Sequence, residues 1–185
     1  MSYTEIYSFN KKGEPDFLGE TPNAWRGAMA VWKILEEKHL PSLPMPDWAL
    51  GEKREYWSRT TIPHFDDSKP NPMKEIWSLF DGDKLSYSEK VVLGSTFDNI
   101  VIKFENIDKV IEAFKNFDET TSLSEQATIL EGLLKNDDIM AVAFNQTSIV
   151  DDGWLTHDYD EVKDESISYN LLTGEKHWFL FDELK

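Results

Sequence analysis

Two short stretches of the sequence combine histidine with aspartate, residue types that bind divalent metal ions. They are "PHFDD", which contains His64, and "THDYDE", which contains His157. Hard cations such as Mg²⁺ and Mn²⁺ prefer oxygen ligands, and in a hydrolase such an ion lowers the pKa of a bound water molecule. If the fold brings the two stretches together, the metal ligands are His64, Asp66, Asp67, His157, Asp158 and Asp160. The alternative is that both stretches are solvated loops.

The second stretch belongs to a longer acidic segment, "VDDGWLTHDYDEVKDE", at residues 150–165. Burying so many carboxylates without cations costs several kcal/mol for each one. We therefore expect residues 155–165 to form a solvated connection, with Trp154 tucked against the body of the protein. A tryptophan with carboxylates on both sides can bind a basic protein through cation–π contact and charge pairing. The binding residues that this interpretation predicts are Trp154, Asp151, Asp152, Asp158, Asp160 and Glu161.

A third candidate site follows the apolar run "IMAVAF", which predicts a buried strand. The next residues are Asn145, Gln146, Thr147 and Ser148. Their amide and hydroxyl groups could hydrogen-bond a small polar ligand, such as a nucleotide or a sugar. The alternative is that they satisfy the backbone at a turn, which is the commoner use of these residue types.

The composition excludes several classes of chemistry. There is no cysteine among the 185 residues, so disulfides, thiolate catalysis and cysteine-bound zinc are excluded. The net charge of −16 argues against direct binding to nucleic acid, because the phosphate backbone would repel such a surface. The sequence has no glycine-rich phosphate loop, no G-x-S-x-G and no H-E-x-x-H. We therefore lean against an enzyme and expect no cofactor.

Hydropathy gives expectations about the location of the protein. Hydrophobic residues make up 40% of the chain, which is enough to form a core. No apolar run approaches the roughly 20 residues needed to cross a bilayer. The first ten residues, "MSYTEIYSFN", lack the basic and apolar regions of a signal peptide. The sequence therefore predicts a soluble cytoplasmic protein with no membrane partner.

Local patterns indicate an α+β protein. The first twenty residues alternate around "NKKGEP", which predicts a hairpin, and a second hairpin is expected to turn at Thr173–Gly174. The most regular helix is expected at residues 22–38, with Thr21 as its cap and one apolar face formed by Trp25, Met29, Trp32 and Leu35. A Ser86–Glu89 capping box predicts another helix start.

The predicted architecture is a single globular domain over residues 1–185, with a mostly antiparallel sheet of about five strands and four or five helices packed on it. Six of the eight prolines fall in residues 41–72, where they disfavour a long helix or a central strand. The aromatic residues of the same stretch indicate that it packs on the domain. We therefore expect an ordered proline-rich excursion at residues 41–72.

Several stretches taken together resemble a family of small uncharacterised proteins carried by phages and prophages of Gram-positive bacteria. They are "NAWRGAM" with "VWKILEEKHLP", "FNQTSI" followed by "GW", and "YNLLTGE" with "WFLFDEL". The resemblance implies a mobile-element context, and it implies no activity and no site.

Three functions from different classes remain open on the sequence. The first is a small acidic, non-enzymatic interaction protein that binds, and thereby inhibits or adapts, a basic host or phage protein. The second is a metal-dependent hydrolase that uses the two histidine and aspartate stretches. The third is a binder of a small polar ligand at the strand end that carries Asn145.

Overall fold

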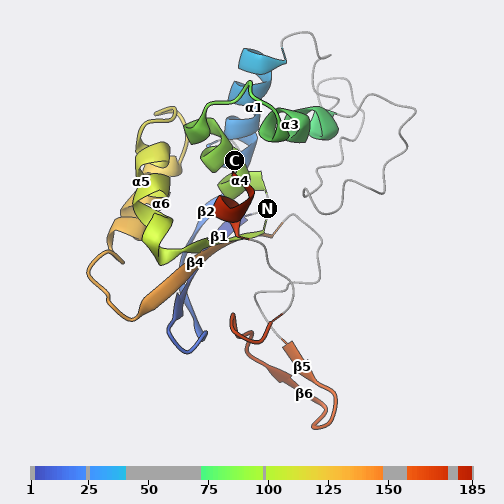
Figure 1. Ribbon diagram of the computed structural model, residues 1–185, viewed down its shortest axis with the longest axis vertical. Coiled ribbons are helices and arrows are strands. Elements are labelled where there is room, and N and C mark those ends of the chain that lie inside the picture. The colour runs from blue at the N-terminus through green and yellow to red at the C-terminus, as the bar shows by residue number, and fades with distance from the viewer. Residues whose placement is uncertain are drawn as a thin grey trace.

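A computed structural model describes residues 3–23, 26–40, 72–97, 99–147, 158–174 and 179–184. Four strands form one antiparallel sheet in the order β2-β1-β4-β3 (Figure 1). Their bounds are β1 Tyr3–Asn10, β2 Pro15–Pro22, β3 Ile100–Lys103 and β4 Ile139–Gln146. The α+β class and the antiparallel pairing are confirmed. The expected count of about five strands is corrected to four in this sheet, since two further described strands pair with each other elsewhere.

The β1–β2 hairpin forms where the alternating pattern predicts it. Its turn is held by Asn10, whose Oδ1 accepts hydrogen bonds from the backbone N–H groups of Lys12 and Glu14 at 2.9 and 3.1 Å. Gly13 adopts a φ of +79°, a conformation that glycine reaches without steric cost. The turn chemistry of the sequence therefore fixes the position of the hairpin.

Helices cover one face of the sheet. Six α-helices lie within the described ranges, against four or five expected: α1 Ala28–His39, α3 Pro72–Asp81, α4 Tyr87–Phe97, α5 Ile107–Lys115, α6 Leu123–Glu131 and α7 Leu180–Glu183. Strand residues that point to this face, such as Ile6, Ile102 and Phe144, are fully or almost fully buried beneath them. Phe114 of α5 meets Phe144 edge to face at 5.8 Å. This layer is the larger part of the core.

The opposite face of the sheet is covered by the segment that precedes α7. Tyr169 and Leu171 pack on Phe9, Val101 and Ala143. Tyr169 contacts the ring of Phe9 edge to face at 6.0 Å. Because β4 is central and covered on both sides, its sequence reads as an apolar run without alternation.

Helix α1 begins six residues later than the sequence predicted. Thr21 and Pro22 belong to β2, where they pair with Thr4 and Tyr3 of β1. Thr21 Oγ1 accepts a hydrogen bond from Gln126 at 2.6 Å and does not cap the helix. Strand pairing therefore overrides the capping signal. Trp32 and Leu35 are buried as expected, at 2% and 0% exposure, but Met29 is only half-buried, and Trp25 lies outside the described residues.

The C-terminal part of the chain also departs from the prediction. Residues 171–173 form a turn beside the expected position at Thr173–Gly174, but residues 165–167 pair antiparallel with residues 158–160, which precede them in the chain. Leu180 then begins α7, so the described residues do not form the second arm of the expected hairpin. Phe179 makes an isolated parallel bridge with Val101. Residues 41–71 of the proposed proline-rich excursion lie outside the described residues, and Pro72 begins α3.

No helix in the described residues is both long enough and apolar enough to span a bilayer.

Candidate functional site

The acidic segment folds in part into a hairpin, which we call the acidic hairpin (residues 158–167). Its strands are β5 Asp158–Asp160 and β6 Glu165–Ile167, which pair antiparallel. Asp160 Oδ1 holds the turn, because it accepts hydrogen bonds from the backbone N–H groups of Val162 and Lys163 at 3.0 and 3.2 Å. Asp164 closes the turn at a φ of 57°, a conformation that aspartate tolerates better than most residues. The expected solvated connection is thus a folded hairpin in residues 158–165.

The tip of the acidic hairpin is exposed. Glu161, Asp164 and Glu165 are exposed, and Val162 is 95% exposed between them. Lys163 is the only basic residue in residues 158–167, against five carboxylates, so the hairpin carries a net charge of −4. Backbone and side-chain hydrogen bonds from Lys163 lower the pKa of Asp160 from its usual value, so this carboxylate stays ionised at neutral pH.

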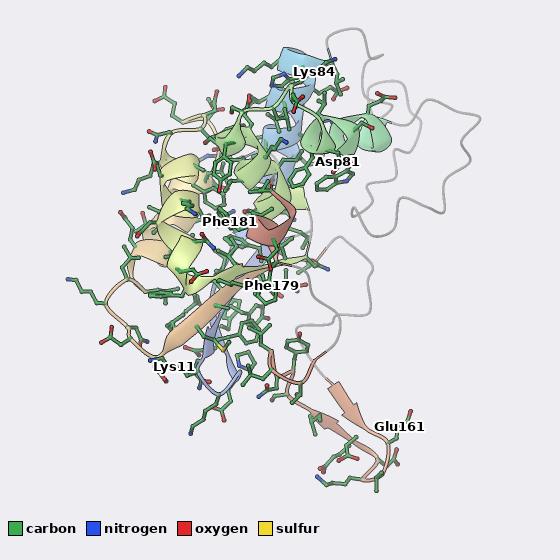
Figure 2. The ribbon with its side chains drawn as sticks, in the orientation of Figure 1. Lys11, Asp81, Lys84, Glu161, Phe179 and Phe181 are labelled. Carbon is green, nitrogen blue, oxygen red and sulfur yellow. The ribbon has the colours of Figure 1, made fainter. Side chains whose placement is uncertain are left out.

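The root of the acidic hairpin, by which we mean the residues that follow it at 168–171, is hydrogen-bonded to the β1–β2 turn. Leu171 donates its backbone N–H to the carbonyl oxygen of Gly13 at 2.9 Å, and Asn170 Nδ2 donates to that of Lys12 at 2.9 Å. From this anchored root the hairpin projects away from the sheet and helices (Figure 1). Glu161 lies near its end in Figure 2, pointing away from the rest of the molecule. The charge is therefore presented on a protruding element.

The structure places only some of the predicted site residues. Asp160 and Glu161 lie on the acidic hairpin, and Asp158 begins β5. The described residues contain no group of three histidine, aspartate or glutamate side chains that could hold a metal ion. The predicted site residues that lie outside the described ranges are His64, Asp66, Asp67, Asp151, Asp152, Trp154 and His157.

The strand-end amides have partners within the protein. Gln146 is 2% exposed, its Nε2 donates to the carbonyl oxygen of Ser95 at 3.2 Å, and its Oε1 accepts from Thr4 at 2.7 Å. Asn145 Nδ2 donates to Glu5 Oε2 at 2.8 Å. Thr147 Oγ1 accepts the backbone N–H of Tyr3 at 2.8 Å. A small ligand at this strand end would have to displace these bonds.

A second charged cluster joins the end of α1 to the start of α4, and the sequence did not predict it as a unit. The capping box is confirmed: Glu89 accepts the N–H of Ser86 at 2.8 Å, and Ser86 Oγ accepts the N–H of Glu89 at 3.3 Å. The other carboxylate oxygen, Glu89 Oε1, lies 2.7 Å from Lys38 Nζ and 3.0 Å from His39 Nε2. Ser86–Glu89 and His39 were each visible in the sequence, but their meeting depends on tertiary packing.

Glu89 is buried yet ionised. Burial alone would raise its pKa, but hydrogen bonds from Lys38, His39 and Ser86 lower the pKa from 4.5 to about 2. A carboxyl group with this pKa is a poor general acid or base near neutral pH. The cluster therefore joins two helices, and its geometry favours a structural role over catalysis.

Comparisons with known proteins found no matching family model, no matching curated protein and no matching solved structure. The resemblance to phage-borne proteins therefore stays a prediction.

Proposed function

We propose that the protein is an acidic, non-enzymatic interaction protein that binds a basic host or phage protein through the acidic hairpin. The observation that carries this proposal is the exposure of three carboxylates around an exposed valine at the end of a projecting element. An exposed apolar side chain with three exposed carboxylates around it suits a partner with an apolar pocket rimmed by lysine and arginine. The predicted partners are proteins, not nucleic acids or membranes.

The charge contributes mainly to encounter and specificity. Like charges held together on a protruding element attract a basic surface over about a Debye length, roughly 8–10 Å at moderate salt. Val162 then supplies the contact that excludes water, because a buried apolar side chain contributes more to affinity than an exposed ion pair. Asp160 has a structural role, since the hydrogen bonds that its carboxylate accepts from the turn hold the conformation of the tip.

The test removes charge from the tip and keeps Asp160, whose carboxylate accepts the hydrogen bonds that hold the turn. The hairpin variant carries Glu161→Gln, Asp164→Asn and Glu165→Gln, and it keeps Asp160. Asparagine suits the conformation of Asp164, which has a φ of 57°. The control variant removes three charges from exposed positions on the α5 side of the molecule through Glu105→Gln, Glu112→Gln and Glu119→Gln. Both variants have the same net charge, so a difference in binding between them reports the position of the removed charges and not the total charge.

Affinity capture from a bacterial lysate, followed by mass spectrometry, identifies the partner. The wild-type chain and the control variant should retain the same basic protein at low salt, and the hairpin variant should lose it. Capture that persists unchanged at 0.5 M salt, or that is equal for both variants, would contradict the proposal.

A further inference from the structure

A cleft of about 320 Å³ lies where the β1–β2 hairpin meets the chain between α6 and β4. Its apolar wall includes Leu18, Leu133 and Ile139, and Ser8 also lines it. Ligand sites in proteins span roughly 300–1,000 Å³, so this cleft is at the small end of that range. Its size suits one side chain better than a cofactor.

Among the described residues that line the cleft, every charged one is acidic. These acidic residues are Glu14, Asp16 and Asp138. Glu14 accepts a hydrogen bond from Asn10, whereas the carboxylates of Asp16 and Asp138 make no ion pair or hydrogen bond within the described part of the chain. The lysines of the adjoining turns, among them Lys11 in Figure 2, are not lining residues. The cleft is therefore complementary to a cation.

Ser8 gives a second, independent indication of a ligand. It is 2% exposed and lies on the helix-covered side of β1, two residues from Ile6. Its hydroxyl group has no hydrogen-bond partner among the residues that the structure describes, although it lines the cleft. Because this hydroxyl group lines the cleft, water reaches it there, and it is not one of the fully buried polar atoms that lack a partner. A donor group that enters the cleft takes the place of water as the hydrogen-bond partner of Ser8 Oγ.

We propose that the cleft binds one lysine side chain of the basic partner, an inference that rests on the proposed function. The methylene chain packs on Leu18, Leu133 and Ile139, and the ammonium group donates to Ser8 and to the free carboxylates. The cleft adjoins the turn to which the root of the acidic hairpin is bonded, through Asn170 and Lys12. One partner can therefore engage both surfaces.

The test uses the full chain and a compound that stands for one lysine side chain. Methyl groups of Leu18, Leu133 and Ile139 are followed by NMR during titration with acetyl-lysine methylamide. Acetyl-norleucine methylamide is the matched control, because it has the same methylene chain without the ammonium group. The lysine compound should give saturable shifts, and the norleucine compound should not. Asp16→Asn with Asp138→Asn should weaken binding by about tenfold, as expected for two partly exposed charge pairs.

Ser8→Ala should also weaken binding of the lysine compound, while the hairpin variant should bind it like the wild type. No saturable shift, equal shifts with norleucine, tighter binding of acetyl-arginine methylamide, or unchanged affinity in the double aspartate variant would overturn the inference. Failure here leaves hairpin-dependent capture of a partner intact. Loss of that capture, with lysine binding preserved in the cleft, would instead contradict the proposed function.

Discussion

Glu89 and Glu161 show two opposite uses of the same side chain. Glu89 is 7% exposed and accepts hydrogen bonds from two basic residues and a serine, which hold its pKa at about 2. Glu161 is exposed at the tip of the acidic hairpin, where it has no bonded partner within the described part of the chain. The first carboxylate links α1 to α4. The second is exposed to solvent, and we propose that it contacts the partner protein.

The comparison shows that net charge alone is a poor guide to function in this chain. A buried carboxylate contributes through its hydrogen bonds, and its charge is neutralised inside the fold. An exposed carboxylate adds little to stability and acts through the field that it projects. Variants in the two regions should therefore differ in what they change: stability at the α1–α4 junction, and binding at the acidic hairpin.

The largest effect is expected for Trp32→Ala in α1. Trp32 is 2% exposed in the core between the helices and the sheet, and truncating a large aromatic side chain there costs about 3–5 kcal/mol. The matched change in the hairpin is Val162→Ala, which should leave the free energy of unfolding nearly unchanged. Urea denaturation measures both values. A wild-type midpoint for Trp32→Ala would show that the helix face is wrongly assigned.

Acid should lower the free energy of unfolding by protonating Glu89, which joins α1 to α4 through Lys38 and His39. Its folded pKa of about 2 is below the usual 4.5, so its contribution is complete above about pH 4.5 and is lost as the pH falls toward 2. The shift corresponds to about 3 kcal/mol, at 1.36 kcal/mol per unit. Glu89→Gln serves as the control, since it should remove this part of the pH dependence. Equal acid sensitivity in both proteins, measured by urea denaturation from pH 6 to pH 2, would refute the assignment.

Glu161→Gln should change the free energy of unfolding by less than about 0.5 kcal/mol, because substitutions of exposed residues away from special features rarely do more. The same substitution at Glu89 should be clearly destabilising, since it removes a buried charge that two basic side chains face. Thermal melts of the two single variants compare the regions directly. Equal losses at both sites would mean that the acidic hairpin contributes to the fold.

The smallest effect is expected from divalent metal. Millimolar Mn²⁺ should produce no rise in the melting temperature that depends on His157, because the hairpin acids are interpreted as partner contacts. The hydrolase alternative makes the opposite prediction: a rise of several degrees in the wild type that His157→Ala abolishes. That result would place metal binding ahead of partner binding.

The elements that local signals define were predictable from the sequence. The β1–β2 hairpin, the start of α4 at Ser86 and the buried strand β4 follow from turn residues, a capping box and an apolar run. The errors came where pairing at a distance overrides a local signal. Thr21 resembles a helix cap, yet it pairs with Thr4 of β1 and belongs to β2. Residues 165–167 pair with β5 and not with the described residues that follow them.

The candidate site was predictable in composition but not in shape. The density of carboxylates identified the acidic segment, and the exposure of its described tip agrees with the cost of burying them. The hairpin itself depends on the hydrogen bonds that Asp160 accepts from the backbone of its own turn, which a run of acids does not reveal. The junction at Glu89 and the cleft at Ser8 each combine residues far apart in the chain, so one sequence could not predict either.

The most direct test of the central claim is the affinity of the purified partner for three proteins: the wild type, the hairpin variant and the control variant. Dissociation constants are measured across a salt series. We expect the hairpin variant to bind about tenfold or more weakly, as for the loss of three partly screened charge contacts, with a flatter salt dependence. We expect wild-type affinity and salt dependence for the control variant. Equal weakening in the two variants would contradict the central claim, because binding would then follow total charge and not the acidic hairpin.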